Sequence, residues 1–375
     1  MPIAPFTPWT RRAAPLVACL ALVVVVARTV WGSEVTSVFG NPVAPPPARA
    51  EIVNNPAARD TRVQRDGEVA GGDLNIDALM GRSRRVFVRL VQRDEVPEFP
   101  GLIERFGNSV LEPGIRRVEG AAAGADFSFI TLLPWGRKLG DQINGYNVGW
   151  WPAERRAMPT NYDNPIGFVE VTPENVNTQL SEHFRLRDFV THDQVSTWPK
   201  YVVLREDLLD KLELVLQTLQ GEGVPALHAT VLSGFRSPQY NVRGMGEGMA
   251  FASRHQFGDA ADVIIDADGD GRMDDLNRDG IVDFRDTDVI NRAVERVEWR
   301  YPELVGGLGL YRAMGPSGPF AHIDVRGKRA RWTNANSSRR GGSSSRYEFT
   351  AEPPTHATGR CQAEGAMAVL CAGMR

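Results

Sequence analysis

The chain has 375 residues, which is enough for two domains with additional tails. Its 43 basic and 46 acidic side chains leave a formal net charge of -3, so nucleic acid, which needs an excess of basic groups, is excluded as an expected partner. The apolar content of 42% is ordinary for a soluble globular protein, while 37 glycines and 25 prolines indicate a large share of loop.

The N-terminal segment has the pattern of an export signal. Arg11 and Arg12 precede the apolar run 13–27, which is shorter than the roughly 20 residues of a membrane-spanning helix and suits the core of a signal peptide. Because 29–31 extends the apolar run, an uncleaved anchor is the alternative. We therefore expect residues 1–33 to be a signal peptide or membrane anchor. The rest of the protein would be periplasmic or extracellular, with membrane contact only through this segment.

Two regions without catalytic motifs follow. Residues 34–82 are rich in Pro, Ala and polar residues and predict a linker. Residues 83–175 predict a β-rich accessory domain, with strands over 86–91 and 127–133. The tryptophan pair 150–151 could stack on sugars, but we expect tryptophan in a small domain to be part of the core. The sequence assigns no role to this region.

Residues 180–335 predict a second domain of mixed helix and strand. The segments 204–220 and 287–299 each carry apolar residues on one helical face. Strands are expected over 227–232 and 263–265. The expected fold class is thus α+β, with a small antiparallel sheet and flanking helices.

The C-terminal residues 336–375 are of low complexity and predict a disordered tail. Cys361 and Cys371 lie in this tail. In an oxidising compartment they would either close a small disulfide loop or stay as thiols.

A metal-ligand pattern stands in the second domain. His255 and Asp262 are seven residues apart in Ser-Arg-His-Gln-Phe-Gly-Asp-Ala-Ala-Asp, and His322 follows downstream in Phe-Ala-His-Ile-Asp. Two imidazoles and one carboxylate are a common ligand set of catalytic zinc, with the fourth position left for water. Small residues between the first two ligands allow close packing against the buried strand that follows.

The order of these motifs resembles a known family. Ser-Gly-Phe-Arg-Ser-Pro at 233–238, the ten residues 253–262, Gly-Gly-Leu-Gly-Leu-Tyr at 306–311 and His-Ile-Asp at 322–324 resemble the M15-type zinc peptidases. These include D-Ala-D-Ala carboxypeptidases and murein endopeptidases. The resemblance covers roughly residues 181–332. It implies an exported zinc hydrolase whose partners are peptidoglycan peptides, cut at stem-peptide or cross-link bonds by zinc-activated water.

The resemblance also implies roles for individual residues. It implies zinc bound by His255, Asp262 and His322. Arg236 would bind substrate and stabilise the oxyanion, although a buried ion pair is the structural alternative. Ser253 would hydrogen-bond the substrate or the residues behind the ligands.

The residues at the family's positions for the general base depart from the family pattern. Relatives carry Glu three residues before the last zinc histidine or His two before it, where this chain has Pro319 and Phe320. Asp324 is the remaining candidate base, or else a carboxylate that supports a ligand from behind. Asp259 is a candidate to orient a ligand imidazole.

An acidic insert, 266–286, separates the ligand pair from His322 and has the spacing of calcium loops. A first loop would use Asp266, Asp268, Asp270 and Asp274, with Gly271 at position six. A second and better loop would use Asp275, Asn277, Asp279, the backbone carbonyl of Ile281, Asp283 and Asp286, with Val282 facing the core. A solvated acidic loop is the alternative to a structural calcium site.

Three classes of function are therefore open. The intact ligand set favours a zinc peptidase. The missing glutamate favours a non-catalytic cell-wall-binding module on the same fold. The acidic insert favours a calcium-dependent interaction protein.

Overall fold

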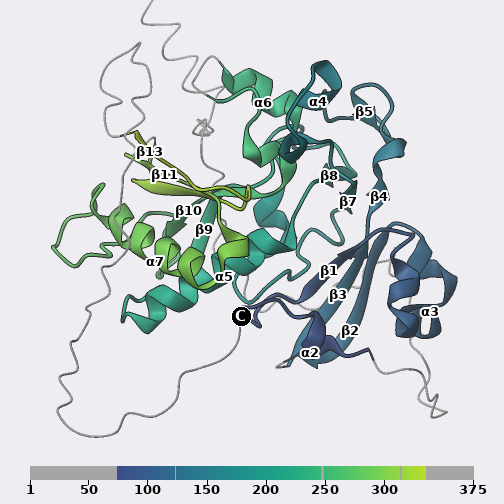
Figure 1. Ribbon diagram of the computed structural model, residues 1–375, viewed down its shortest axis with the longest axis horizontal. Coiled ribbons are helices and arrows are strands. Elements are labelled where there is room, and N and C mark those ends of the chain that lie inside the picture. Colours follow the sequence, from purple (N-terminus) through teal and green to yellow (C-terminus); the bar gives the residue numbers. More distant parts are fainter. Residues whose placement is uncertain (1–73, 123, 246–248, 313–314, 335–375) are drawn as a thin grey trace, which may run out of the picture.

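The computed structural model describes residues 74–122, 124–245, 249–312 and 315–334. These residues form an α+β fold of helices and small sheets, as expected (Figure 1). The expected leader, the tail and the two tail cysteines lie outside the described residues, as does most of the expected linker. No helix in the described ranges is long and apolar enough to cross a membrane.

The largest sheet has five strands in the order β13-β11-β12-β10-β9. Their bounds are β9 (Ala229–Ser233), β10 (Ala260–Ile265), β11 (Gly307–Tyr311), β12 (Phe320–Asp324) and β13 (Ala330–Asn334). Three of the pairings are antiparallel, but β11 and β13 are parallel. The sheet is therefore mixed rather than wholly antiparallel as expected, because the chain turns back after β12 and pairs with the far edge of β11.

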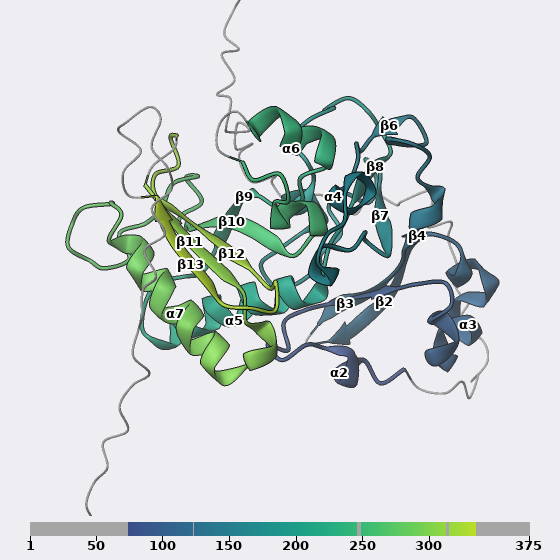
Figure 2. The same cartoon turned by 45° about the horizontal axis from the view of Figure 1, so that its top comes forward.

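Two long helices cover one face of this sheet (Figures 1 and 2). They are α5 (Glu206–Gly221) and α7 (Asp286–Arg300), which confirm the two expected helices and pack against each other. Lys211 of α5 is fully buried between them, and its Nζ donates to Glu298 Oε1 of α7 and to Asp324 O of β12, both at 2.7 Å. Both helices are thus tied to the strand that carries His322.

The first described residues form a smaller layer. Its sheet has the order β1-β3-β2, from β1 (Val88–Val91), β2 (Gly114–Ala122) and β3 (Ala125–Thr131). The helices α2 (Ile76–Leu79) and α3 (Pro100–Phe106) pack on it, and a separate apolar cluster forms between them. The end of the expected linker differs from the structure, because α2 lies within it and the backbone N–H groups of Arg82 and Ser83 donate to Asp210 of α5.

The segment between these layers packs with the large sheet. It holds β4 (Leu133–Pro134), β5 (Gln142–Ile143), β6 (Tyr146–Asn147), α4 (Pro152–Arg155), β7 (Gly167–Val171) and β8 (Lys200–Val202), and α6 (Pro238–Gly244) follows β9. Trp151 is buried, stacks on Phe235, and donates its Nε1–H to Gln256 O at 2.8 Å. Packing therefore joins residues 133–171 to the core of the following domain, at variance with the expected boundary near residue 175.

Candidate metal centre

Three neighbouring elements bring the expected ligands together. Asp262 of β10 and His322 of β12 are directly paired across adjacent strands, so their side chains share one face of the sheet. His255 lies in the short helix Arg254–Phe257 that leads into β10. Gly258 makes the turn between them in the left-handed region (φ 66°), where a Cβ would lie 2.3 Å from Val203 O.

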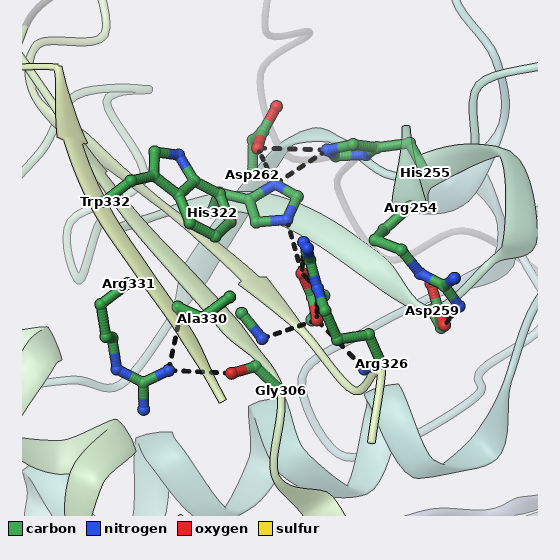
Figure 3. A network of polar contacts seen from close by, with 12 residues as sticks. Arg254, His255, Asp259, Asp262, Gly306, His322, Arg326, Ala330, Arg331 and Trp332 are labelled. Atoms are coloured by element: carbon green, nitrogen blue, oxygen red, sulfur yellow. Dashed lines mark hydrogen bonds and ion pairs between the residues drawn. The ribbon is translucent and has the colours of Figure 1, made fainter. Parts of the chain in front are cut away.

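The ligand atoms form a compact triangle (Figure 3). His255 Nε2 lies 3.1 Å from His322 Nδ1 and 3.3 Å from Asp262 Oδ1, and His322 Nδ1 lies 3.0 Å from Asp262 Oδ1. Ligands about 2.0–2.1 Å from a tetrahedral zinc ion are separated from one another by about 3.3–3.4 Å. The triangle is slightly tighter than that ideal, and small movements of the side chains would accommodate zinc.

Hydrogen bonds on the outer side of each imidazole orient the lone pairs inward. His255 Nδ1 donates to Gly234 O at 2.7 Å, and His322 Nε2 donates to Asp324 Oδ2 at 3.0 Å. These bonds select tautomers in which His255 Nε2 and His322 Nδ1 are unprotonated. Two nitrogen lone pairs and a carboxylate oxygen then face one another, an arrangement that a cation stabilises.

The charge states of the ligands also suit a metal. Burial, together with the positive charge of Arg236, lowers the pKa of His255 to about 4, so this imidazole is neutral near pH 7. Burial opposes ionisation of Asp262, but His255 and Arg236 hold the pKa of this carboxyl well below its usual range. Burial likewise opposes protonation of His322, but its bonds to Asp262 and Asp324 raise its pKa. A proton therefore competes with a metal for His322.

Asp324 lies behind His322, on the side of the imidazole that faces away from Asp262. Its side chain is 0% exposed and contacts the imidazole nitrogen that points away from Asp262. It also accepts from Gly307 N at 2.7 Å and from Arg326 N and Nε at 3.1 and 2.9 Å. Its place therefore differs from that expected of a general base and agrees with the alternative, a carboxylate that orients a ligand.

The glycines of the 306–311 motif make room for this arrangement. A Cβ on Gly306 would lie 1.8 Å from Asp324 O, and one on Gly307 would lie 2.3 Å from Asp324 Oδ2. A Cβ on Gly309 would lie 2.3 Å from Trp332 Nε1, so the indole occupies the space that glycine leaves. Each glycine is thus required by close approach of a group that supports His322.

Sequence reasoning missed Arg326 and Trp332. The guanidinium of Arg326 pairs with Asp324 and lies over the Trp332 ring. The Trp332 ring lies 5.2 Å from the imidazole of His322, and its Nε1 donates to Tyr311 OH at 2.7 Å. Arg326 could have been found from the sequence, because it lies two positions after Asp324 and so on the same side of an extended chain.

Arg236 and Ser253 lie beside the triad. Arg236 pairs with Asp262 Oδ2 and donates its Nε–H to Ser233 Oγ at 2.7 Å, with its side chain mostly buried. The structure therefore shows the ion pair that was the alternative to an oxyanion role. Ser253 is half-buried and precedes the helix of His255, and its carbonyl accepts from Gln256 N at 3.1 Å.

Asp259, the residue expected to orient a ligand imidazole, takes another partner. Asp259 is buried and pairs with Arg254, whose Nε lies 3.0 Å from Asp259 Oδ1. It orients no ligand imidazole, because Gly234 O and Asp324 already accept from both rings. His183 also lies outside the triad, with its Nδ1 2.7 Å from Glu213 Oε2.

The acidic insert divides into two parts. Among the described residues, Asp266, Asp268 and Asp270 of the first loop bring carboxylate oxygens within 4.8 Å of one another, while no such group of three carboxylates forms in the second loop. Ile281 and Val282 are 55% and 47% exposed, so the expectation that Val282 faces the core is wrong.

Comparisons with known proteins add no relative. No family model, no curated protein and no solved structure matches this chain. A function for the chain therefore has to be argued from its motifs and from the geometry of the triad.

Proposed function

We propose that this protein is an exported zinc metallopeptidase, on an M15-like α+β domain, that hydrolyses D-Ala-type stem-peptide or cross-link bonds of peptidoglycan. The observation that carries the proposal is the triangle of His255 Nε2, His322 Nδ1 and Asp262 Oδ1, whose sides measure 3.0–3.3 Å. The order of the surrounding motifs, which resembles M15-type peptidases, supports the substrate class. The apolar leader supports export to the periplasm or beyond.

The chemistry needs a metal and an organised set of side chains. Zinc supplies Lewis-acid catalysis when bound, polarising a peptide carbonyl and activating water near neutral pH. Asp324 holds the imidazole of His322 in the ligating tautomer. Arg236 balances the charge of Asp262, and its guanidinium is the cation nearest the triad for binding a carboxylate or carbonyl of a substrate.

A second candidate, a non-catalytic cell-wall-binding module, is favoured by one observation. The contacts of Asp324 with His322, Gly307 and Arg326 hold it on the side of the His322 ring away from Asp262. The family positions for another base hold Pro319 and Phe320. A module that keeps the ligands but lacks a base would bind peptidoglycan without cutting it.

One experiment separates the two candidates. The zinc-loaded full chain is incubated with purified peptidoglycan, and the soluble fragments are analysed by mass spectrometry. His255→Ala removes a ligand, and His228→Ala is the matched control because His228 is exposed and outside the triad. If the protein is a peptidase, the wild type and the control release fragments and His255→Ala does not. The fragment masses then identify the bond that is cut. Sedimentation with intact peptidoglycan but no fragments would establish the binding module instead, and the absence of both would refute both candidates.

A further inference from the structure

We infer that the acidic insert holds a single calcium ion at its first loop, formed by the carboxylates of Asp266, Asp268, Asp270 and Asp274. This site lies outside the zinc triad, and its existence does not depend on the proposed peptidase activity. Of the two calcium loops that the sequence predicts, only the first would then bind an ion, although the second has the better ligand spacing.

A buried, unpartnered oxygen in the first loop points to a cation. Asp266 is only 1% exposed, and its Oδ2 accepts from Thr230 Oγ1 at 2.7 Å and from Gly271 N at 3.1 Å. Its Oδ1 is also buried and has no hydrogen-bond partner among the residues that the structure describes. A buried carboxylate oxygen requires a partner, and the neighbouring side chains of Asp268 and Asp270 offer only negative charge.

Asp274 faces the same group of charges. Burial raises the pKa of Asp274, and the negative charges of Asp268, Asp266 and Asp270 raise it further. The basic side chain within the loop does not offset these charges, since Arg272 donates its Nε–H to Pro316 O at 3.1 Å. Four carboxylates thus converge without a basic partner in the described ranges.

The chemistry of the site selects calcium. Oxygen ligands at positions one, three, five and nine of a loop, with glycine at six, belong to the pattern that wraps this hard cation. Gly271 occupies position six in the left-handed region (φ 80°). The exposed carboxylates of Asp268 and Asp270 give the loop the freedom that calcium tolerates and the strictly octahedral magnesium ion does not.

The second loop is held by its own residues. Arg285 pairs with Asp279 Oδ2 and with Asp283 Oδ2, both at 2.9 Å. Asp286 is buried and accepts backbone N–H groups at both oxygens, from Leu276 and Asn277 on Oδ1 and from Asp283 on Oδ2. An arginine and three backbone donors therefore take the places that a second ion would need.

Calcium at the first loop would brace the strands that carry the triad. Asp266 directly follows β10, and Asp274 N donates to Ile265 O at 3.0 Å. Met273, which is buried, donates its N–H to Ser317 O at 2.9 Å in the segment before β12. The loop therefore links the end of β10, the strand of Asp262, to the start of β12, the strand of His322, at the edge of the molecule where α7 begins (Figure 1).

Calorimetric titration of the full chain with calcium chloride tests the inference. Asp268→Asn/Asp270→Asn removes two exposed ligands of the first loop, and Asp279→Asn/Asp283→Asn is the matched control in the second loop. We expect one ion per chain, with a dissociation constant of about 10⁻⁴–10⁻³ M or tighter. The first variant should weaken binding at least about tenfold and lose the calcium-induced rise in Tm, while the control keeps both.

Three outcomes would overturn the inference. They are two ions per chain, loss of binding in the second-loop variant alone, or no heat of binding up to about 10 mM calcium. Magnesium binding as tight as calcium binding would refute the choice of ion. Because the readout is ion binding, failure here leaves the peptidase proposal intact, and an inactive enzyme that binds one calcium ion leaves this inference intact.

Discussion

Replacing Asp324 by Asn is the sharpest test of how the triad is held. Asn keeps the size of the side chain but presents an amide NH₂ or a weaker acceptor to His322 Nε2, which now donates to Asp324 Oδ2 at 3.0 Å. Since Gly307 N and the Arg326 guanidinium also need acceptors here, the amide oxygen will be drawn toward them and the NH₂ toward the imidazole. The ring would then favour the tautomer with its proton on Nδ1, the ligating atom.

The expected cost follows from the role of such carboxylates. Residues that hydrogen-bond a ligating histidine from behind typically change metal affinity 10–100-fold when replaced, or about 1.4–2.7 kcal/mol. We expect zinc affinity of Asp324→Asn to fall by this amount, measured by competition with a fluorescent zinc indicator. At saturating zinc, hydrolysis should recover most of its wild-type rate, because Asp324 is buried behind His322 and acts only through that ring.

The control is Asp259→Asn, which changes the same chemical group at another buried carboxylate. Asp259 pairs with Arg254 and touches no ligand, so its replacement should affect stability but leave zinc affinity within about twofold. Zinc affinity unchanged in Asp324→Asn, with hydrolysis lost even at saturating zinc, would refute the positioning role. That result would restore Asp324 as the general base.

Three further predictions concern stability, each measured by urea unfolding. Gly258→Ala should cost about 2–4 kcal/mol, because the φ of 66° is strained for alanine and its Cβ would lie 2.3 Å from Val203 O; a smaller loss would mean that the turn relaxes. Lys211→Met should lower the free energy of unfolding by about 1–3 kcal/mol, because Glu298 Oε1 and Asp324 O lose a buried donor while Arg331 still pairs with Glu298; a neutral result would contradict this. Burial raises the pKa of Asp193, whose carboxylate oxygens are buried without hydrogen-bond partners in the described ranges, so the folded state loses stability as pH rises through that raised pKa. The stability of Asp193→Asn relative to the wild type should therefore increase between pH 4 and pH 7. If the difference in free energy of unfolding stayed constant across this range, the ionised carboxylate would carry no such penalty.

The long helices and the pair of His255 and Asp262 were predictable because their signals are local. The apolar faces of α5 and α7 repeat along the sequence with the helical period, and both helices form where expected. The ligands could be grouped because His255 and Asp262 flank a single turn. The pairing of Asp262 with His322 depends on strand register, and only the order of the motifs hinted at it.

The sequence could not reveal the roles of individual aspartates, because these roles depend on which neighbouring donors bond each carboxylate. The spacing of Asp324 from His322 fits both a base and an orienting carboxylate, and the choice is made by Arg326 and Gly307, which draw the carboxylate behind the ring. The second acidic loop has the better calcium spacing, yet Arg285, a residue at a position that the spacing rule ignores, pairs with two of its carboxylates. In both places a nearby arginine decides the role of an aspartate. Removing Arg285 should therefore free Asp279 and Asp283 for a second, weaker ion, although Asp286 stays bonded to backbone N–H groups. Calorimetric titration of Arg285→Ala would then show two ions per chain in place of one.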